Sequence, residues 1–503
     1  VSALTAGDNI SISTAGVVAS VSGTADFVAS GTLPNGAPVV LKSDGTVVTV
    51  GINVTTTVAE SIPAGSDHVF NAAATNTPSI AFDPNNSGKF VIAYGDSGNS
   101  YYGTAVLGTI SGTTLSFGTA VIFSSSSSRY YVSVEFDPNT SGQFVVAYRD
   151  DTDSNKGKSI VGTLSGTSIA FPSAAVVFNE ATTSFVNVAF DPNVANKFIV
   201  TYNDGGNSNY GTAVLGTISG ISTTFGTGVV FNTSDTSDTD ITFDPNTSGK
   251  FVVVYRDSGN SSIGTLIVGT LSGTSVIFGT AVTYVTGYAQ GYVSFDPNAA
   301  GKFVVAYRAG SIGFSGAARV GTVSGTTITL GSETVFNAGN TFYIGIAFDP
   351  NTSGKFVVVY RDAGDTNLGK GVVGTISGTT LSFGTEFQHS ASTSNFNNVA
   401  FDPNAAGKFV VSYQDYDNSN HGTAVVCQME QLSLGVTNLT STNFLGTSQA
   451  AYTNTQTATI MLQGGVSTNQ TGLTIGSTYY VQPDGTLSTT AGHPIVEAGK
   501  ALS

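Results

Sequence analysis

The sequence of 503 residues predicts an all-β fold, a seven-bladed β-propeller of four-stranded blades flanked by a small β module at each end. The tetrapeptide Phe-Asp-Pro-Asn occurs seven times, at intervals of 52 to 54 residues. An apolar run such as FVVAYRD follows each copy, and Gly-Thr-x-Ser-Gly follows six of them, with no amphipathic helical period between. Strand-only self-similarity at this spacing is typical of propellers. The copies begin at Phe82, Phe136, Phe190, Phe243, Phe295, Phe348 and Phe401.

Each repeat divides into four expected strands separated by turn residues. The first strand ends at Phe-Asp-Pro, as in residues 186–192, and Asp-Pro-Asn-x-x-Gly then forms a turn in which Pro restricts φ. The second strand, residues 143–150 in the second copy, is apolar on both faces, which predicts that neighbouring blades cover both of its sides. In the first copy the third and fourth strands are expected at residues 103–111 and 115–123.

The seventh repeat stops after its third strand, near Gln428, so its fourth strand must come from elsewhere. Residues from about 57 to 71 are expected to supply it, because Phe70 precedes Phe82 by the twelve residues that recur in other repeats. This strand would complete the last blade and remove the two sheet edges of an open ring. The predicted domains are therefore residues 1–50, 51–432 and 433–503.

The segments at the two ends of the chain share a sequence frame. Residues 33–50, LPNGAPVVLKSDGTVVTV, align with residues 473–490, LTIGSTYYVQPDGTLSTT. Each contains two apolar runs around Asp-Gly, a hairpin signal. We therefore expect one small β module at each end.

The composition excludes several classes of partner and of bond. The net charge of −15 disfavours nucleic acid and anionic membranes, which both need basic patches. A single cysteine, Cys427, excludes an intramolecular disulfide, and its apolar surroundings predict a buried core residue. No apolar run approaches 18 residues, so no membrane insertion is expected.

No catalytic constellation is found in the sequence, and no enzyme activity is predicted. The four histidines lack Cys, His or acidic partners at metal-ligand spacing, and no Gly-x-Ser-x-Gly or phosphate loop occurs. The repeated motif aspartates are interpreted as structural, each accepting backbone N–H groups to close its turn. They are Asp83, Asp137, Asp191, Asp244, Asp296, Asp349 and Asp402.

Acidic side chains in the hairpins after the second strands permit one metal hypothesis. Asp150 and Asp153, and likewise Asp415 and Asp417, resemble loosely the calcium loops of other propellers. Ordinary Asx turns are the preferred interpretation. No cofactor is therefore predicted, and weak calcium binding is the alternative hypothesis.

Four arginines end second strands at equivalent positions: Arg149, Arg256, Arg308 and Arg361. The repeat places them on one end of the ring, where they could bind an acidic glycan or a lipopolysaccharide phosphate through bidentate contacts. Ion pairs between blades are the alternative, with the neighbouring Asp or a motif Asp as partner.

Both ends of the chain, LTAGDNISIS with FVASGTLPNGAPVVLKSDGTV and GLTIGSTYYVQPDGTLSTTAG, resemble segments of virion structural proteins of tailed bacteriophages, marine cyanophages especially. The FDPNTSGKFVVVYRD repeats are similar to propellers in such proteins. The resemblance implies a non-enzymatic virion surface protein, such as a tail fibre, a receptor-binding protein or a capsid-attached fibre. It also implies other virion proteins and a host-surface glycan as partners, a homo-oligomer (a trimer by analogy), and a place on the particle surface or tail.

Two other function classes stay open. A secreted or cell-surface glycan-binding adhesin or lectin would use the repeats multivalently, with tyrosines instead of Trp as sugar platforms. An enzyme on a propeller scaffold ranks last. The matching modules at the two ends favour the virion protein, because a free lectin has little use for them.

Overall fold

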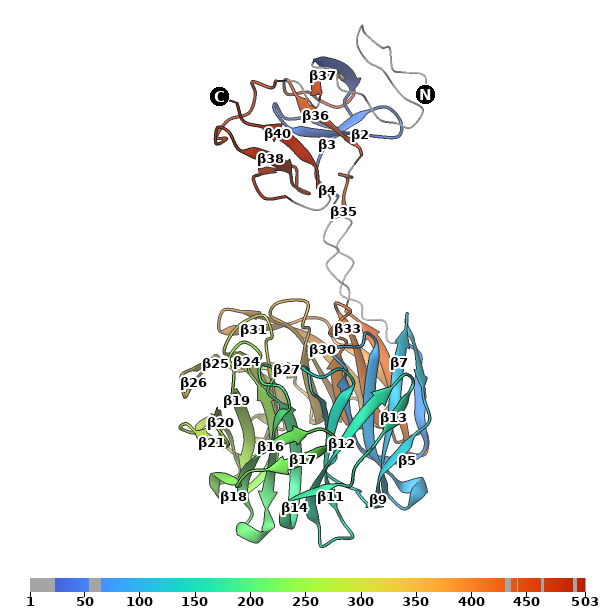
Figure 1. The fold of residues 1–503 in the computed structure, drawn as a ribbon, viewed down its shortest axis with the longest axis vertical. Coiled ribbons are helices and arrows are strands. Elements are labelled where there is room, and N and C mark those ends of the chain that lie inside the picture. Colours follow the sequence, from blue (N-terminus) through green and yellow to red (C-terminus); the bar gives the residue numbers. More distant parts are fainter. Residues whose placement is uncertain are drawn as a thin grey trace. The chain divides into compact units, whose positions relative to one another are not determined.

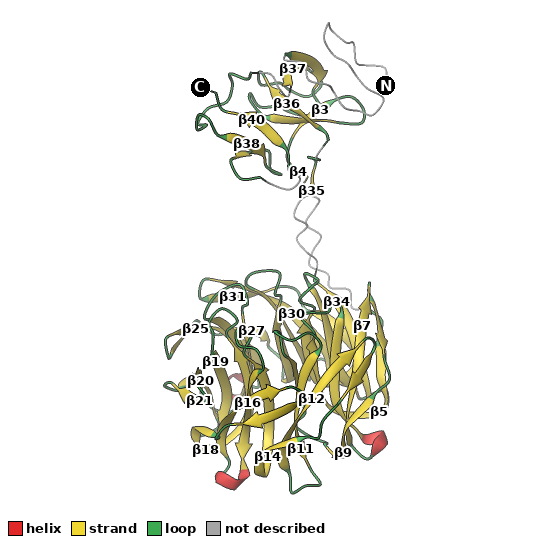
Figure 2. Cartoon of the chain, in the orientation of Figure 1, coloured by secondary structure: helices red, strands yellow, loops and turns green. Residues whose placement is uncertain are grey.

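The computed structural model describes residues 23–53, 65–429, 436–440, 442–462, 466–491 and 495–502. The chain forms two compact units, one of residues 60–430 and one that combines residues 1–59 with residues 431–503 (Figure 1). Both units are built from strands, and the described helices are three short 3₁₀ turns (Figure 2). These turns are η1 (Ser97–Asn99), η2 (Gly205–Asn207) and η3 (Gly310–Ile312). None of the described helices has the length and apolar character needed to cross a membrane.

The repeat unit consists of antiparallel strands that recur with the sequence period. The second strands are β6 (Lys89–Asp96), β11 (Gln143–Asp150), β15 (Lys197–Asp204), β19 (Lys250–Asp257), β24 (Lys302–Ala309), β29 (Lys355–Asp362) and β33 (Lys408–Asp415). Each pairs with the third strand of its repeat, and these are β7 (Tyr102–Ser111), β12 (Lys156–Ser165), β16 (Tyr210–Ser219), β20 (Ile263–Ser272), β25 (Ser315–Ser324), β30 (Leu368–Ser377) and β34 (His421–Gln428).

Four strands of 15 residues each serve two neighbouring repeats. The first half of such a strand pairs with the third strand of one repeat, and its second half pairs with the second strand of the next. They are β5 (His68–Phe82), β14 (Val176–Phe190), β18 (Val229–Phe243) and β32 (Phe387–Phe401). Elsewhere the two halves are separate strands, namely β9 (Val121–Ser127) and β10 (Ser133–Phe136), β22 (Val282–Val285) and β23 (Ala289–Phe295), and β27 (Thr334–Asn337) and β28 (Thr341–Phe348).

The strand expected at residues 115–123 is two strands in the structure. The first is a short hairpin arm, β8 in the first repeat, that pairs with the end of β7, whereas β9 pairs with its beginning. The break falls at Gly118, where an added Cβ would lie 3.0 Å from the Thr167 carbonyl of the next repeat. The hairpin arms are β8 (Thr114–Phe117), β13 (Ser168–Ala170), β17 (Ser222–Phe225), β21 (Ser275–Phe278), β26 (Thr327–Leu330) and β31 (Thr380–Phe383).

All seven motif aspartates are buried, and six of them join the turn of one repeat to the turn of the next, whereas Asp83 accepts from Asn85 and Asn86 in its own turn. One carboxylate oxygen of Asp244 accepts a hydrogen bond from the Asn246 N–H at 3.0 Å, and the other accepts from the Gly301 N–H at 2.9 Å. The same bond to a following turn is made by Asp137, Asp191, Asp296, Asp349 and Asp402. For Asp402 the donor is Gly88 of the first repeat, at 3.1 Å.

Backbone contacts also connect the last repeat with the first. The third strand β34 pairs with residues 68–74 of β5, with Gly422 opposite Asn71. Part of the segment expected to supply this strand, residues 57–64, lies outside the described residues. A side-chain contact does the same: the side-chain amide of Asn404 donates to the Pro84 carbonyl at 3.3 Å, as that of Asn246 does to Pro297 between neighbouring repeats.

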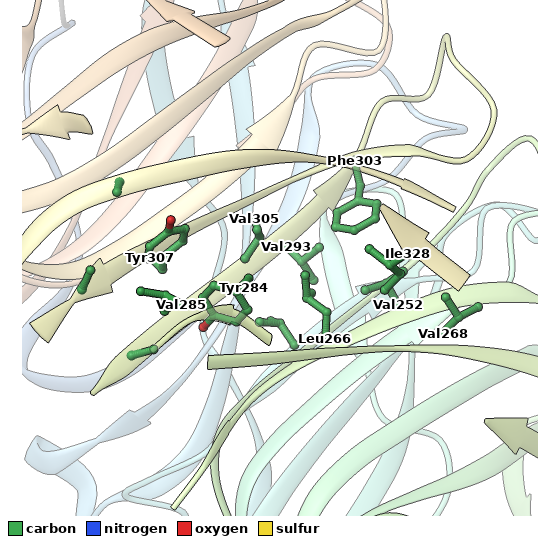
Figure 3. Packing of buried hydrophobic residues seen from close by; sticks show 14 of the residues in the cluster. Val252, Leu266, Val268, Tyr284, Val285, Val293, Phe303, Val305, Tyr307 and Ile328 are labelled. Atoms are coloured by element: carbon green, nitrogen blue, oxygen red, sulfur yellow. The ribbon is translucent and has the colours of Figure 1, made fainter. Parts of the chain in front are cut away.

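Apolar side chains on both faces of the second strands form the cores between repeats. In the cluster of Figure 3, Val252 and Leu266 come from the fourth repeat, and Val293, Phe303 and Tyr307 from the fifth. Related clusters occupy the other boundaries. Both faces of a second strand are therefore covered, as its continuous apolar sequence indicates.

In six repeats the first Gly of Gly-Thr-x-Ser-Gly lies directly against the ring of the Phe that begins the second strand's apolar run. A Cβ on Gly269 would lie 2.1 Å from the ring of Phe251, its partner across the strand pair. The same distance is 2.1 or 2.2 Å in the five other repeats that carry the motif. In the seventh repeat the residue opposite Phe409 is Cys427, which is 1% exposed, and burial raises the pKa of its thiol.

The two ends of the chain form one unit, whereas the sequence predicts a module at each end. A five-stranded sheet has the order β1-β37-β36-β2-β3, so two strands from the C-terminal end lie between strands from the N-terminal end. A second sheet has the order β39-β38-β40, and β4 pairs with β35. The strands are β1 (Thr24–Val28), β2 (Pro38–Leu41), β3 (Val47–Thr49), β4 (Ile52–Asn53), β35 (Val436–Thr437), β36 (Phe444–Ser448), β37 (Thr457–Leu462), β38 (Thr478–Val481), β39 (Leu487–Ser488) and β40 (Glu497–Lys500).

Candidate functional site

A cavity of about 800 Å³ is lined by the first strands of all seven repeats. These first strands are the second halves of β5, β14, β18 and β32, together with β10, β23 and β28. The strand starts contribute mostly large or polar side chains to its wall, and the strand ends contribute the motif prolines. We call the residue five positions before each motif Phe the strand-start residue. These residues are Thr77, Tyr131, Phe185, Asp238, Gln290, Tyr343 and Phe396.

Six of these seven strand-start residues have an uncommon backbone conformation. Their φ lies between 41° and 59°, which non-Gly residues rarely adopt, and Gln290 is the exception. In five repeats the pairing with the second strand shifts register at this point, as between Ser237 and Asp240. Such a bulge re-aims a side chain. The bulge thus directs the strand-start side chain of the repeat toward one end of the cavity.

The arginines that end the second strands pack on aromatic rings at this end. The Cζ atom of Arg149 lies 5.4 Å from the ring centre of Tyr130 and 5.0 Å from that of Tyr131. Tyr288 likewise lies between Arg256, at 4.6 Å, and Arg308, at 5.5 Å. We call this set the arginine-aromatic surface, which consists of Tyr101, Arg129, Tyr130, Tyr131, Arg149, Arg256, Tyr288, Arg308, Phe314, Phe342, Tyr343 and Arg361.

Two of the four arginines named from the sequence have carboxylate partners. Arg149 Nε lies 2.6 Å from an oxygen of Asp151, and Arg256 Nη2 lies 2.9 Å from an oxygen of Asp238. Burial raises the pKa of Asp238, and the Arg256 charge opposes that rise. Each of these two arginines therefore forms an ion pair, but both pairs lie within one repeat and neither partner is a motif Asp, so they differ from the pairs between blades that the sequence suggested.

The other two arginines have amide oxygens as partners instead. Arg308 donates through Nε and Nη2 to Asn340 Oδ1, at 3.3 and 3.0 Å. Arg361 donates through Nη1 to Asn395 Oδ1 at 2.5 Å. In the described part of the chain neither guanidinium has a carboxylate within 4.0 Å. Their positive charge is therefore not neutralised by a direct ion pair.

Several residues of this surface were not identified from the sequence. Arg129 covers the ring of Tyr101 at 3.9 Å but lies in a loop outside the second-strand pattern. Phe342, which packs between two of the arginines, has no aromatic equivalent in most repeats. The one available signal was the cross-strand position, since Phe342 stands directly opposite Arg361.

Two carboxyl groups lie deeper in the cavity. Glu135 and Asp240 line its wall, and Asp240 accepts a hydrogen bond from the Val293 N–H at 3.0 Å. Burial raises the pKa of Glu135 to about 8, and the nearby Asp240 contributes to this rise. Burial also raises the pKa of Asp240 to about 7. Both groups therefore titrate near neutral pH.

The acidic residues proposed for calcium have protein partners. Lys158 Nζ lies 2.8 Å from an oxygen of Asp150 and 2.7 Å from one of Asp153, so an ammonium group stands between the two carboxylates. Asp415 accepts from the Asn418 N–H at 3.2 Å, and Asp417 accepts from the Thr393 N–H at 2.8 Å.

No described cluster of three or more His, Cys, Asp and Glu side chains has the arrangement to hold a metal ion. His389 is 3% exposed, and its Nε2 donates a hydrogen bond to Asn397 Oδ1 at 3.3 Å. Burial lowers its pKa to about 4, so its imidazole is neutral at neutral pH.

No family model and no curated protein matches the sequence. Among solved structures the chain is similar to the BP39L lectin of Burkholderia pseudomallei, with 11% identity, a TM-score of 0.49, and coverage of 72% of this chain and 97% of the lectin. It is also similar to Sqt1 of Saccharomyces cerevisiae, with 12% identity, a TM-score of 0.44, and coverage of 80% and 100%. A protein of unknown function from Dyadobacter fermentans has 12% identity and a TM-score of 0.45, with coverage of 73% and 99%. Similarities this weak carry no information on the ligand or activity of this chain.

Proposed function

We propose that the seven repeats close into a seven-bladed β-propeller around the cavity. The pairing of β34 with β5 supports this proposal, because it joins the last repeat to the first. The hydrogen bonds from Gly88 to Asp402 and from Asn404 to Pro84 repeat, at that junction, the contacts between neighbouring repeats. In this arrangement the arginine-aromatic surface lies at one end of a single central cavity.

We further propose that the protein is a non-enzymatic phage virion surface protein whose propeller is displayed for attachment to the host surface. The observation that carries this proposal is the packing of Arg308 and Arg361, which have no carboxylate partner among the described residues, on aromatic side chains at one end of the cavity. Arginine binds sugar-borne anions with directed hydrogen bonds, and aromatic rings pack on the apolar faces of sugars. The ligand is then a host-surface glycan.

The resemblance of both chain ends to phage virion segments supports the assignment to a particle. The terminal unit, in which both ends join one sheet, is the part that contacts other virion proteins and assembles the chain into a homo-oligomer. A trimer is expected by analogy with phage fibres. The propeller then carries recognition and the terminal unit carries attachment to the particle.

Antibodies against the full chain and an adsorption assay test this function. The antibodies should label tailed particles from the source of the sequence in electron micrographs, and free full-length protein should reduce adsorption of those particles to host cells. Binding to cells without any labelling of particles would contradict the virion assignment. That result would favour the alternative, a secreted or cell-surface glycan-binding lectin, for which the same arginine-aromatic surface is the supporting observation.

A further inference from the structure

We propose that Arg308 and Arg361, with Phe342 between them, form the subsite that binds a carboxylate or sulfate group of an acidic polysaccharide. This inference rests on the proposed glycan-binding function and assigns it to one sector of the arginine-aromatic surface. Arg149 and Arg256 are assigned to structural ion pairs instead.

The two guanidinium groups are neighbours on one aromatic ring. Their Cζ atoms lie 4.0 Å and 4.7 Å from the ring centre of Phe342, so both arginines stand beside the same ring and one polysaccharide chain lying over that ring can approach both. Phe314 is 4.3 Å from Arg308 on another side, and Tyr343 is 4.8 Å from Arg361. Ring packing of this kind holds the planar guanidinium in one orientation, which lowers the entropy cost of binding.

The donors of this pair exceed the acceptors that the described part of the chain offers them. A guanidinium has five N–H donors, but Arg308 has two side-chain acceptors, the Tyr288 hydroxyl and a single oxygen of Asn340 that takes two of its nitrogens. Arg361 Nε is buried and has no hydrogen-bond partner among the described residues. A buried donor without a partner is costly and marks a place where a ligand or ordered water completes the set.

The charges of this pair also repel each other. Partial burial lowers the pKa of both guanidinium groups, and the Arg308 charge lowers that of Arg361 as well. Arginine stays protonated all the same. An anionic group of a ligand bound beside them would reduce this repulsion. The Asp151 and Asp238 carboxylates pair directly with the other two arginines.

The apolar surroundings indicate that the anion is carried by a sugar. Phe314 is 38% exposed, and Phe342 and Tyr288 are partly exposed beside the same arginines. Such rings can pack on the C–H face of a pyranose while the guanidinium groups bind its anionic substituent. A small free anion would gain nothing from these rings.

Binding of the full chain to three polysaccharides tests the subsite. Polygalacturonate supplies carboxylates, dextran sulfate supplies sulfate esters, and neutral dextran is the uncharged control. Wild-type protein should bind one or both acidic polymers and not dextran. The double variant Arg308→Gln with Arg361→Gln should lose affinity by roughly tenfold or more, because two charge-assisted contacts are removed. Glutamine is a fitting replacement, since Gln414 holds the same position in the seventh repeat.

The matched control is the double variant Arg149→Gln with Arg256→Gln. It should keep the affinity for the polymer within about threefold and should lower the melting temperature more, because it leaves Asp238, whose side chain is only 14% exposed, without its cation. Equal loss of affinity in both double variants, or none in the Arg308 and Arg361 pair, overturns the subsite. Absence of binding to both acidic polymers overturns it too.

A second variant keeps the arginines and neutralises one of them. Asn340→Asp replaces the amide that Arg308 already contacts by a carboxylate of nearly the same shape. The fold should therefore be retained, while the affinity for the acidic polymer falls because the charge of Arg308 is neutralised. Unchanged affinity in this variant counts against the subsite. Attachment of the full chain to host cells is measured in parallel: if the Arg308 and Arg361 pair variant still attaches, the subsite fails and the proposed function stands. If wild-type protein does not attach, the proposed function fails by itself.

Discussion

At the scale of single residues, the motif aspartate carries the connection between repeats. The seven-fold recurrence of one Asp in the sequence indicated a structural role in its own turn. The second hydrogen bond, to the following repeat, could not be predicted, because it joins residues nearly sixty positions apart, as Asp244 and Gly301 are. Periodicity identifies equivalent positions but not which of them touch.

Asp244→Ala should lower the free energy of unfolding by about 3 kcal/mol, because it removes two hydrogen bonds to a buried carboxylate. Urea denaturation of the full chain measures the change. The control is Asn246→Ala in the same turn, which removes only an exposed contact with Pro297 and should cost less than about 1 kcal/mol. Equal costs for the two variants would contradict the bridging role of Asp244.

For the four arginines too, the sequence predicted the equivalent positions but not the partners. Their equivalence was evident from the sequence, yet two form ion pairs and two do not, because the partners come from non-equivalent positions such as Asp238 and Asn340. Arg129 was missed since it lies outside the repeat pattern.

Added calcium and EDTA should both leave the melting temperature unchanged, because the Lys158 ammonium already stands between Asp150 and Asp153. Differential scanning calorimetry of the full chain checks this. A calcium-dependent rise of several degrees would show that the loops around Asp415 and Asp417, or others, bind the ion.

At the scale of elements, the alternation and the turn residues predicted the second and third strands well. Residues 143–150 were expected as a strand and form β11. The expected strand at residues 115–123 is divided, since the backbone of the next repeat approaches Gly118. Contacts between repeats of this kind leave no local signal beyond a glycine.

Gly269→Ala should destabilise the repeat unit by about 1–3 kcal/mol, because the new methyl group overlaps the Phe251 ring and the core must move. Thermal unfolding provides the comparison with Ser272→Ala, an exposed change at the end of the same strand β20, which should stay within about 0.5 kcal/mol of wild type. A Gly269→Ala protein as stable as the Ser272→Ala protein would show that the ring and the glycine do not pack as described.

At the scale of the whole molecule, the pairing of distant segments was the least predictable feature. The similar frames of residues 33–50 and 473–490 suggested two modules, whereas β2 and β36 pair within one sheet. Alternation defines which face of a strand is apolar but does not name its partner.

The contribution of Glu135 and Asp240 to the free energy of unfolding should fall as the pH rises from about 4 through 8. Their folded-state pKa values, about 8 and about 7, lie above the unfolded values, so the folded chain binds protons more tightly. This contribution is complete below the unfolded pKa values and is lost as the pH passes the folded ones. The double variant Glu135→Gln with Asp240→Asn should therefore gain melting temperature over wild type at pH 9 and much less at pH 5. A constant difference between the two proteins across this range would contradict the raised pKa values.

Closure of the seven repeats is the central claim, because the cavity and the arginine-aromatic surface around its end exist as one site only in a closed ring. Electron cryo-microscopy of the full chain tests it most directly. We expect seven blades around one central cavity, with β5 in the same sheet as β33 and β34. An open arc, with β5 separated from β34, or a ring with another number of blades, would contradict it.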